Sequence, residues 1–306
     1  MTQTPRRPSS ALVAAEPAAL TLPHRVSVVV PAYNEGAHIA PGLEELRRVL
    51  ASTGWDFEII VIDDGSADDT AAAAAAAGVR VFQHRRNRGY GAALKTGIAA
   101  AEHPWILITD ADGTYPAKAI PLLLAAADHN DMVVGARTGQ TVRIPLVRRP
   151  AKWFLKRLAS YLAGQNLPDL NSGLRLMRKD LLAKYLHLLP SGFSFTTTIT
   201  LAAACNEHDV EYVSIDYHAR LGQSKIRPWH AYEFTLLILR TIVFFNPLKV
   251  FIPLGAMLML AGMAKFAYDV TRNNLSESAI FAMLTAMLFW AVGLLADQNS
   301  RMAMRR

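Results

Sequence analysis

Short apolar runs alternate with longer helical segments over residues 25–109. β-Branched and aromatic residues are concentrated in four runs that predict strands, at residues 25–31, 57–62, 79–83 and 105–109. Alanine and leucine are frequent in the segments between them, which predict helices at residues 36–51, 69–77 and 91–101. Asn34 is a candidate cap for the first of these helices. Strands that alternate with helices are typical of an α/β fold, with a mainly parallel sheet and helices on both faces.

The same alternation continues, less regularly, through the next hundred or so residues. Further helices are expected near residues 117–128, 150–163, 179–187 and 195–206. Further strands are expected at residues 131–135, directly after the loop 168–173, and at residues 210–217. A single α/β domain over residues 25–227 therefore accounts for most of the chain.

Two long apolar stretches follow this domain. Residues 279–296 carry no charge, and residues 247–264 carry only Lys249. Both stretches approach the roughly 20 residues that a transmembrane helix needs, and the polar loop 269–278 separates them. The pattern predicts a transmembrane helical hairpin over residues 247–298, and the alternative is a pair of buried core helices.

The remaining segments are predicted from their composition. Residues 1–24 are rich in Pro, Ala and Ser and lack the apolar core of a signal peptide, which predicts a disordered leader. Residues 228–246 mix aromatic side chains with charges and predict an amphipathic helix in the membrane interface. Residues 299–306 form a basic tail.

Charge and cysteine content narrow the classes of function. The formal net charge of +7 suits nucleic acid, an anionic membrane surface or phosphorylated substrates, and the apolar hairpin favours the last two over nucleic acid. Basic residues flank the outer ends of the hairpin, so charge bias places both ends and the α/β domain in the cytoplasm, on a cell membrane crossed by two helices. The single cysteine, Cys205, excludes an internal disulfide and a thiolate metal site, and its apolar surroundings predict a buried side chain.

The sharpest chemical feature is the pair Asp110 and Asp112, which directly follows the fourth predicted strand. Two carboxylates at alternate positions can bind one divalent cation, and the hydroxyl of Thr114 can add a third oxygen ligand. A cation held there can act as a Lewis acid on the phosphates of a substrate. An acidic pair in a turn is more often simply solvated, but the position at a strand end favours the metal site.

Polar residues also follow the first two predicted strands, in Pro31-Ala-Tyr-Asn-Glu35 and Asp63-Asp64-Gly-Ser. Ligands of parallel sheets bind at the carboxyl ends of the strands, where all these groups fall. The Tyr33 ring can stack on a nucleobase, and Glu35 or Asp64 can accept hydrogen bonds from base N–H groups or ribose hydroxyls. Ordinary helix capping and turn formation are the alternative roles.

These motifs occur in the same order in a known family. The series begins with the two motifs above and continues with Asn-x-Gly-x-Gly, Asp-Ala-Asp-Gly-Thr-Tyr-Pro, Gly-Ala-Arg137, Asp169-x-Asn-Ser-Gly173 and Gly-Gln-Ser-Lys225. Over about residues 25–227 the chain resembles family 2 glycosyltransferases of the GT-A fold, a Rossmann-like architecture. Within that family it is most similar to dolichyl-phosphate mannose synthases and bacterial polyprenyl-phosphate glycosyltransferases.

The resemblance implies an activity and a set of site residues. The activity is inverting transfer of a hexose from a GDP- or UDP-linked sugar to a dolichyl or undecaprenyl phosphate at the cytoplasmic membrane face. Mg²⁺ or Mn²⁺ would be held by Asp110 and Asp112, although at the position of Thr114 the archaeal-type synthases have glutamine. Arg148, with Arg149 beside it, takes the place of the arginine assigned to the acceptor lipid phosphate. Donor binding is implied for Pro31, Tyr33, Glu35, Asp63, Asp64, Ala111, Arg137, Arg220 and Lys225.

Several alternatives are open at this stage, and two rivals are disfavoured. A dinucleotide-binding oxidoreductase needs a third glycine where the chain has Leu94, and a processive synthase needs an Arg-Trp dipeptide, which the sequence lacks. A transferase acting on a soluble or glycan acceptor, and a catalytically silent membrane scaffold that binds nucleotide sugars, are not excluded. The basic run from Arg137 to Arg149 can also be a solvated or lipid-facing surface. A second copy of the chain and a flippase are candidate further partners.

Overall fold

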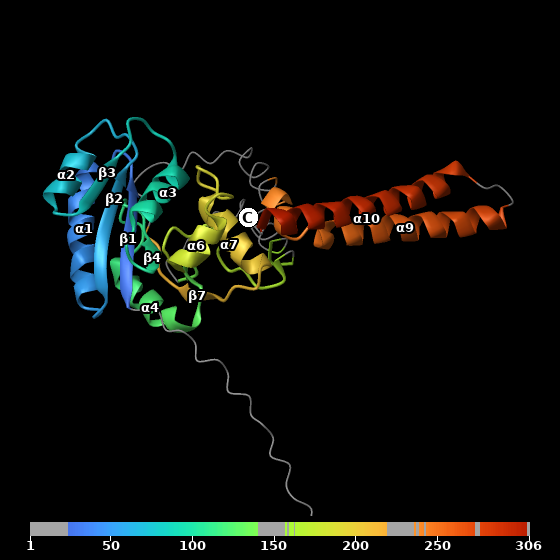
Figure 1. The fold of residues 1–306 in the computed structure, drawn as a ribbon. Helices are drawn as coiled ribbons and strands as arrows, with labels where there is room; N and C mark the ends of the chain where they lie inside the picture. The colour runs from blue at the N-terminus through green and yellow to red at the C-terminus, as the bar shows by residue number, and fades with distance from the viewer. Residues whose placement is uncertain are drawn as a thin grey trace, which may run out of the picture.

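The structure, a computed structural model, describes residues 24–139, 157, 159–161, 163–218, 236, 239–241, 243–272 and 276–304. An α/β body carries a long helical hairpin that projects from one side (Figure 1). The predictions made for the leader up to residue 23, for Arg148, Arg149, Arg220 and Lys225, and for most of the segment 228–246 lie outside the described residues.

The body is built on one seven-stranded sheet in the order β3-β2-β1-β4-β6-β5-β7. The strand β6 runs antiparallel to both of its neighbours, β4 and β5. All other neighbours are parallel, so the predicted mainly parallel sheet is confirmed. The strands are β1 (Arg25–Ala32), β2 (Asp56–Asp63), β3 (Arg80–Gln83), β4 (Trp105–Ile108), β5 (Met132–Ala136), β6 (Arg175–Arg178) and β7 (Val210–Ser214).

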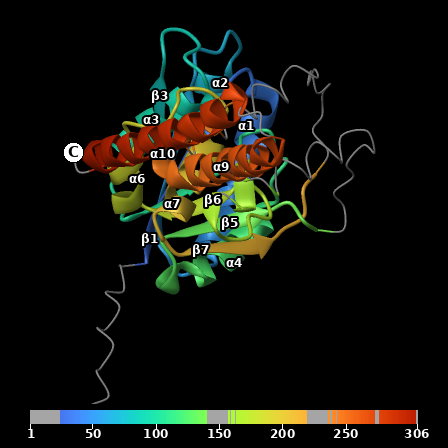
Figure 2. The same ribbon diagram turned by 90° about the vertical axis from the view of Figure 1, so that its right-hand side faces the viewer.

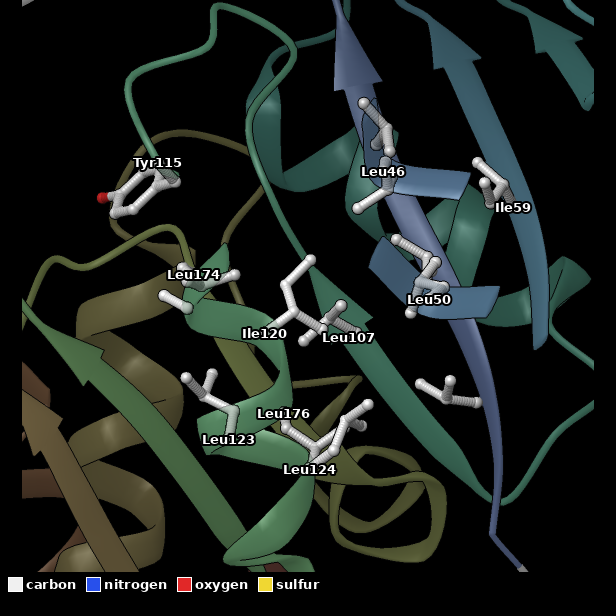
Figure 3. Packing of buried hydrophobic residues seen from close by; sticks show 14 of the residues in the cluster. Leu46, Leu50, Ile59, Leu107, Tyr115, Ile120, Leu123, Leu124, Leu174 and Leu176 are labelled. Atoms are coloured by element: carbon white, nitrogen blue, oxygen red, sulfur yellow. The ribbon is translucent and has the colours of Figure 1, made fainter. Parts of the chain in front are cut away.

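Helices cover both faces of the sheet, as predicted. One face packs against α1 (Gly36–Ala51), α2 (Thr70–Ala76) and α4 (Ile120–Ala125), the last flanked by the 3₁₀ turns Ala117–Ala119 and Ala127–His129. Figure 3 shows leucines of α1 and α4 directed at the sheet residues between them. The other face packs against α3 (Tyr90–Ala100), α6 (Lys179–Tyr185) and α7 (Phe195–Cys205). Because strands β1, β2, β4 and β5 are buried on both faces, they read in the sequence as apolar runs.

The prediction that Asn34 caps α1 is wrong. The residue at the cap position is Glu35, whose side chain makes no capping hydrogen bond. Asn34 itself has a left-handed backbone with φ of 56°, which asparagine adopts more readily than most residues. Its backbone N–H donates to Ser66 Oγ at 2.9 Å and its Oδ1 accepts from the Ala67 N–H at 2.9 Å. Asn34 therefore ties the end of β1 to the loop that follows β2.

The hairpin consists of α9 (Leu248–Thr271) and α10 (Glu277–Met304), both long and apolar enough to cross a membrane. At about 1.5 Å per residue, the 24 residues of α9 reach about 36 Å. Large apolar side chains face outward, including Met257 at 68%, Leu260 at 67% and Phe281 at 65% exposure. Such exposure is contrary to a pair of core helices, which was the alternative. The helix α10 also continues through the segment assigned to a basic tail as far as Met304, with an ion pair of 2.8 Å between Arg301 and Asp297 one turn apart.

The base of the hairpin is packed directly on the body. Phe245 is buried and meets Tyr185 of α6 edge-on, with ring centroids 5.9 Å apart. A few residues later Val250 packs on an apolar cluster that includes Leu201 of α7. Seen along the hairpin, α9 and α10 stand in front of α6 and α7 (Figure 2). The hairpin therefore leaves the body from the α6–α7 face.

Candidate functional site

The two predicted metal-binding carboxylates lie in the loop after β4, and neighbouring groups orient both of them. Asp112 Oδ1 accepts hydrogen bonds from the Thr114 hydroxyl at 2.6 Å and from the Thr114 N–H at 3.1 Å. Asp110 Oδ1 accepts one from the hydroxyl of Tyr90, the first residue of α3, at 2.9 Å. Burial and the nearby Asp110 carboxylate raise the pKa of Tyr90, so the phenol keeps its proton and donates.

The loop 169–173 forms a wall behind Asp110. A Cβ atom added to Gly173 would lie 2.8 Å from Asp110 Oδ2 and 2.9 Å from Asp110 Oδ1, so only glycine permits this approach. The Gly173 N–H donates to the hydroxyl of Tyr115 at 2.6 Å, and burial raises the pKa of Tyr115 to about 12. The Ser172 hydroxyl donates to the Gly135 carbonyl at 2.5 Å. The wall is thus held from the β4 loop and from β5.

Arg137, at the end of β5, forms an ion pair with Asp169 from the same wall. Its Nε lies 2.7 Å from Asp169 Oδ2 and its Nη2 lies 2.8 Å from Asp169 Oδ1. Burial opposes ionisation of Asp169, but the hydrogen bonds and charge of Arg137 outweigh it and lower the pKa of Asp169 to about 2. The guanidinium also lies 5.3 Å from the ring centre of Tyr217. The predicted contact of Arg137 with a donor phosphate would have to be made alongside this pair.

The two acidic residues at the end of β2 face inward. Asp63 is fully buried and accepts hydrogen bonds from the Ser66 N–H at 3.0 Å and from Gln83 Nε2 at 2.8 Å. Asp64 is 3% exposed and accepts from the N–H groups of Arg88 at 3.0 Å and Gly89 at 2.8 Å. Both carboxylates therefore hold the loops around the site together, whatever further contact they make with a ligand.

On the β1 side, Tyr33 is 48% exposed and its ring is accessible for the predicted stacking. Glu35 Oε2 lies 3.9 Å from His38 Nδ1.

A cavity of about 250 Å³ opens beside Asp110 and Ala111, between α1 and the loop after β4. Its walls combine apolar side chains of α1 with Thr109, Lys118 and His218. Of the predicted site residues, Asp110 and Ala111 line this cavity, whereas Asp112 and the predicted base contacts Tyr33, Glu35 and Asp64 are not among its described lining residues.

Sequence comparison assigns the body to a family. Residues 27–186 match the family described as Glycosyl transferase family 2. This chain is a family 2 glycosyltransferase. The resemblance carried by its motifs is thereby confirmed. The glycosyltransferase also matches the family described as GtrB C-terminal hairpin over residues 246–302, the segment that forms α9 and α10. The two apolar helices and this family match together indicate a membrane protein.

Two named relatives are similar over most of their length. The dolichyl-phosphate hexose transferase of Haloferax volcanii is 31% identical over 206 residues, which cover 67% of the glycosyltransferase and 87% of the relative. The undecaprenyl-phosphate 4-deoxy-4-formamido-L-arabinose transferase of Enterobacter sp. (strain 638) is 30% identical over 290 residues, covering 88% and 84% of the two chains. An alignment over 88% of this chain necessarily reaches into the hairpin.

Among solved structures, glucosyl-3-phosphoglycerate synthase from Mycobacterium tuberculosis, in complex with Mn²⁺, UDP and phosphoglyceric acid, has a TM-score of 0.56 and 22% identity. The alignment covers 72% of the glycosyltransferase and 77% of that chain. At this identity the likeness concerns the fold, and the predicted GT-A fold is confirmed.

Four residues of the site were not identified from the sequence. His84 bridges Asp64 Oδ1 at 2.6 Å and the Thr96 hydroxyl at 2.9 Å, behind the site. Tyr90 and Tyr115 belong to motifs that were recognised, but neither was given a role. Phe193, 83% exposed, follows a glycine in the loop between α6 and α7. In each case the partner is distant in the chain, so spacing carries no signal of the contact.

Arg175 is the fifth such residue, and it is fully buried in β6. Its Nη2 donates to the Ser172 carbonyl at 2.7 Å, and its Nη1 donates to the Thr196 carbonyl at 3.1 Å and the Thr200 hydroxyl at 2.9 Å. Burial lowers the pKa of Arg175. The side chain therefore joins the wall behind Asp110 to the first turns of α7. A single cation within the apolar stretch Leu174–Arg175–Leu176–Met177 was the available signal.

Cys205 is partly buried at the end of α7, and burial raises the pKa of its thiol to about 11. A thiol in this state is a poor nucleophile near neutral pH. The side chain is therefore less buried than the sequence predicted.

Proposed function

We propose that this glycosyltransferase transfers a hexose from a GDP- or UDP-linked sugar to a polyprenyl phosphate, with inversion, at the cytoplasmic face of the membrane. One observation carries the proposal. The Asp110–Asp112 pair lies on a body that packs against a hairpin of two helices, each long and apolar enough to span a membrane. The names of the two relatives support a lipid phosphate as the acceptor, since one acts on dolichyl phosphate and the other on undecaprenyl phosphate.

The described residues fit a divalent metal shared with the donor. Nowhere in the described ranges do three His, Cys, Asp or Glu side chains gather to form a complete metal site. Two oriented carboxylates with an adjacent hydroxyl are suited to Mg²⁺ or Mn²⁺ when substrate phosphates supply further oxygen ligands. The bound ion would supply Lewis-acid stabilisation of the departing nucleoside diphosphate. We assign Asp110 and Asp112 as its ligands and Thr114 as a third ligand or as the group that orients Asp112.

The chemistry requires little from a protein base. A polyprenyl phosphate is already an anionic oxygen nucleophile, so its attack on the anomeric carbon needs no strong proton acceptor. The C–O bond to the donor diphosphate breaks as the new C–O bond forms on the opposite face. From the family resemblance, Arg137 and Lys225 would neutralise the donor phosphates, while Arg148 would orient the acceptor phosphate.

A transfer assay tests this function. Purified full-length protein in detergent is incubated with radiolabelled UDP- and GDP-sugars, Mn²⁺ or Mg²⁺, and undecaprenyl or dolichyl phosphate. We expect labelled product in the organic phase that requires both the metal and the lipid phosphate. Label transferred only to a water-soluble acceptor would favour the soluble-acceptor alternative, and binding of nucleotide sugar without any transfer would favour the silent scaffold.

Replacement of Gly173 by alanine is expected to lower the affinity for Mn²⁺ in the presence of UDP by about tenfold to a hundredfold. The new Cβ would lie within 3.0 Å of all three atoms of the Asp110 carboxyl group, which must then move away from Tyr90. Titration calorimetry with Mn²⁺ measures the change. Gly42→Ala is the matched control, because no atom lies within 4 Å of its added Cβ and alanine is favoured in a helix. Equal Mn²⁺ affinities in the two variants would contradict the proposed role of Asp110.

The cytoplasmic orientation gives a second expected result. Alkaline phosphatase fused after Arg306 should be inactive in a bacterial host, because it would remain in the cytoplasm, whereas green fluorescent protein at the same place should fluoresce. The control places alkaline phosphatase in the short connection between α9 and α10, at residue 274, where it should be active. The opposite pattern at the two positions would reverse the proposed orientation.

A further inference from the structure

The loop between α6 and α7 is pressed onto the glycine-containing loop before α3. The Ala92 N–H donates to the Ser191 carbonyl at 3.0 Å. A Cβ at Gly91 would lie 2.3 Å from the Pro190 carbonyl oxygen, and one at Gly89 would lie 2.7 Å from the Ser191 carbonyl oxygen. The contact therefore depends on glycine at both positions, and it fixes the two loops relative to each other.

This contact places an aromatic pair beside the carboxylates. The rings of Phe193 and Tyr90 are stacked, with centroids 5.7 Å apart and planes inclined by 15°. The Tyr90 hydroxyl donates to Asp110 Oδ1 at 2.9 Å, so Phe193 is separated from the site by one side chain. Yet Phe193 is 83% exposed, although a phenylalanine ring gains free energy when it is buried. Tyr90 lies beside the ring, and most of the ring surface is open to a ligand.

We propose that the exposed face of Phe193 is a platform on which the pyranose ring of the donor sugar stacks. This inference rests on the proposed function, which puts the donor diphosphate at Asp110 and Asp112. The hexose is the group attached directly to that diphosphate, and the C–H groups of one pyranose face pack well on an aromatic ring. Tyr90 links the platform to Asp110 and thereby sets the ring against the sugar end of the donor.

Two other occupants fit this position less well. The nucleobase is at the far end of the donor, and the exposed ring available to it, Tyr33, lies at the end of β1. The isoprenoid chain begins beyond the acceptor phosphate, on the side of the anomeric carbon opposite the diphosphate, whereas Tyr90 joins Phe193 to Asp110. The hexose is the part of either substrate that adjoins the diphosphate.

Binding measurements on the full chain in detergent test the platform. Titration calorimetry with Mn²⁺ compares UDP-glucose with UDP, and GDP-mannose with GDP, for wild type and Phe193→Ala. For the nucleotide sugar that wild type binds, we expect Phe193→Ala to weaken the affinity about fivefold to tenfold, as loss of one aromatic stacking contact implies. Its affinity for the matching nucleoside diphosphate should not change. Phe193→Tyr and Phe193→Trp should restore sugar binding, and Tyr161→Ala, which removes another exposed ring, should have no effect.

Three outcomes overturn the platform. Unchanged affinity for the nucleotide sugar in Phe193→Ala would show that the ring makes no contact with the sugar. Equal weakening of nucleotide sugar and nucleoside diphosphate would show that Phe193 acts through Asp110 and the loops alone. If Phe193→Ala raised the KM for polyprenyl phosphate above the wild-type value, by more for longer isoprenoid chains and with donor binding intact, the ring would be assigned to the lipid. A wild-type chain that binds none of the four nucleotides would instead overturn the proposed function, and the platform with it.

Discussion

Asp112→Ala is expected to reduce sugar transfer by about a hundredfold to a thousandfold, as loss of a preorganised charge-stabilising group implies. The variant removes one of two proposed metal ligands. In the wild type the Thr114 hydroxyl donates to Asp112 Oδ1 at 2.6 Å, and the variant removes that acceptor. The stability of the body should change little, because the carboxylate lies in a loop after β4 and not in the core. Initial rates of label transfer to lipid, measured at saturating Mn²⁺, check the first part, and thermal unfolding checks the second.

Asp209→Ala is the matched control for this experiment. Asp209 is exposed and directly precedes the edge strand β7, whereas the carboxylate pair follows the central strand β4. Its variant should transfer sugar at the wild-type rate. If Asp112→Ala kept more than half of the wild-type rate, the assignment of this residue to the metal would be wrong.

Asp169→Ala is expected to lower the free energy of unfolding by about 3–5 kcal/mol, since it leaves a largely buried arginine without its counter-ion. Arg137 and Asp169 are joined by two hydrogen bonds of 2.7 and 2.8 Å, and Asp169 is 9% exposed. The loop 169–173 should loosen as well, because Asp169 Oδ1 also accepts from the Asn171 N–H at 3.1 Å. Denaturant unfolding of the purified protein in detergent, followed by tryptophan fluorescence, measures the change.

The exposed pair of Arg178 and Asp180 provides the comparison. Its Asp180 side chain is 64% exposed, and pairs of this kind contribute at most about 1 kcal/mol. Asp180→Ala should therefore be nearly neutral. A difference of less than 1 kcal/mol between the Asp169 and Asp180 variants would contradict the buried ion pair.

The free energy of unfolding should fall at acid pH because of Asp169. The pKa of Asp169 is about 2 in the folded protein, lower than its ordinary 3.8, because Arg137 outweighs the effect of burial. A lowered folded pKa means that the contribution of this carboxylate is fully present above the ordinary value and is lost as the pH falls through about 2. Wild type should therefore lose stability between these two values, and Asp169→Ala should lose less over the same interval.

The order of elements could be predicted from the sequence because each reflects a local pattern. β-Branched runs marked β1, β2 and β4, and alanine-rich segments marked α2 and α3, each within a few residues of the observed bounds. The direction of β6 could not be predicted in this way. A strand reads the same in either direction, and only its pairing with Ile106 and Val133, far away in the chain, makes it antiparallel.

In the candidate site too, residues with a local sequence signal could be predicted, whereas contacts between distant residues could not. Asp110 and Asp112 were found because carboxylates after a strand are conspicuous in the sequence, and their position is as expected. The supports around them were not found, because they are made by residues that meet only in the folded chain: Tyr90 with Asp110, and Gly173 with the same carboxylate. The inward orientation of Asp63 and Asp64 was likewise invisible, since a turn motif does not say which way its side chains point.

The packing of Phe245 and Val250 on the body has a consequence for how the rate should depend on the lipid. A body on a long flexible tether samples many heights above the bilayer, whereas this one is held close to the base of its hairpin. Encounter with a lipid acceptor then becomes a search in two dimensions. The rate should follow the mole fraction of polyprenyl phosphate in the membrane and not its amount per volume of solution, so that added inert phospholipid slows the reaction by surface dilution.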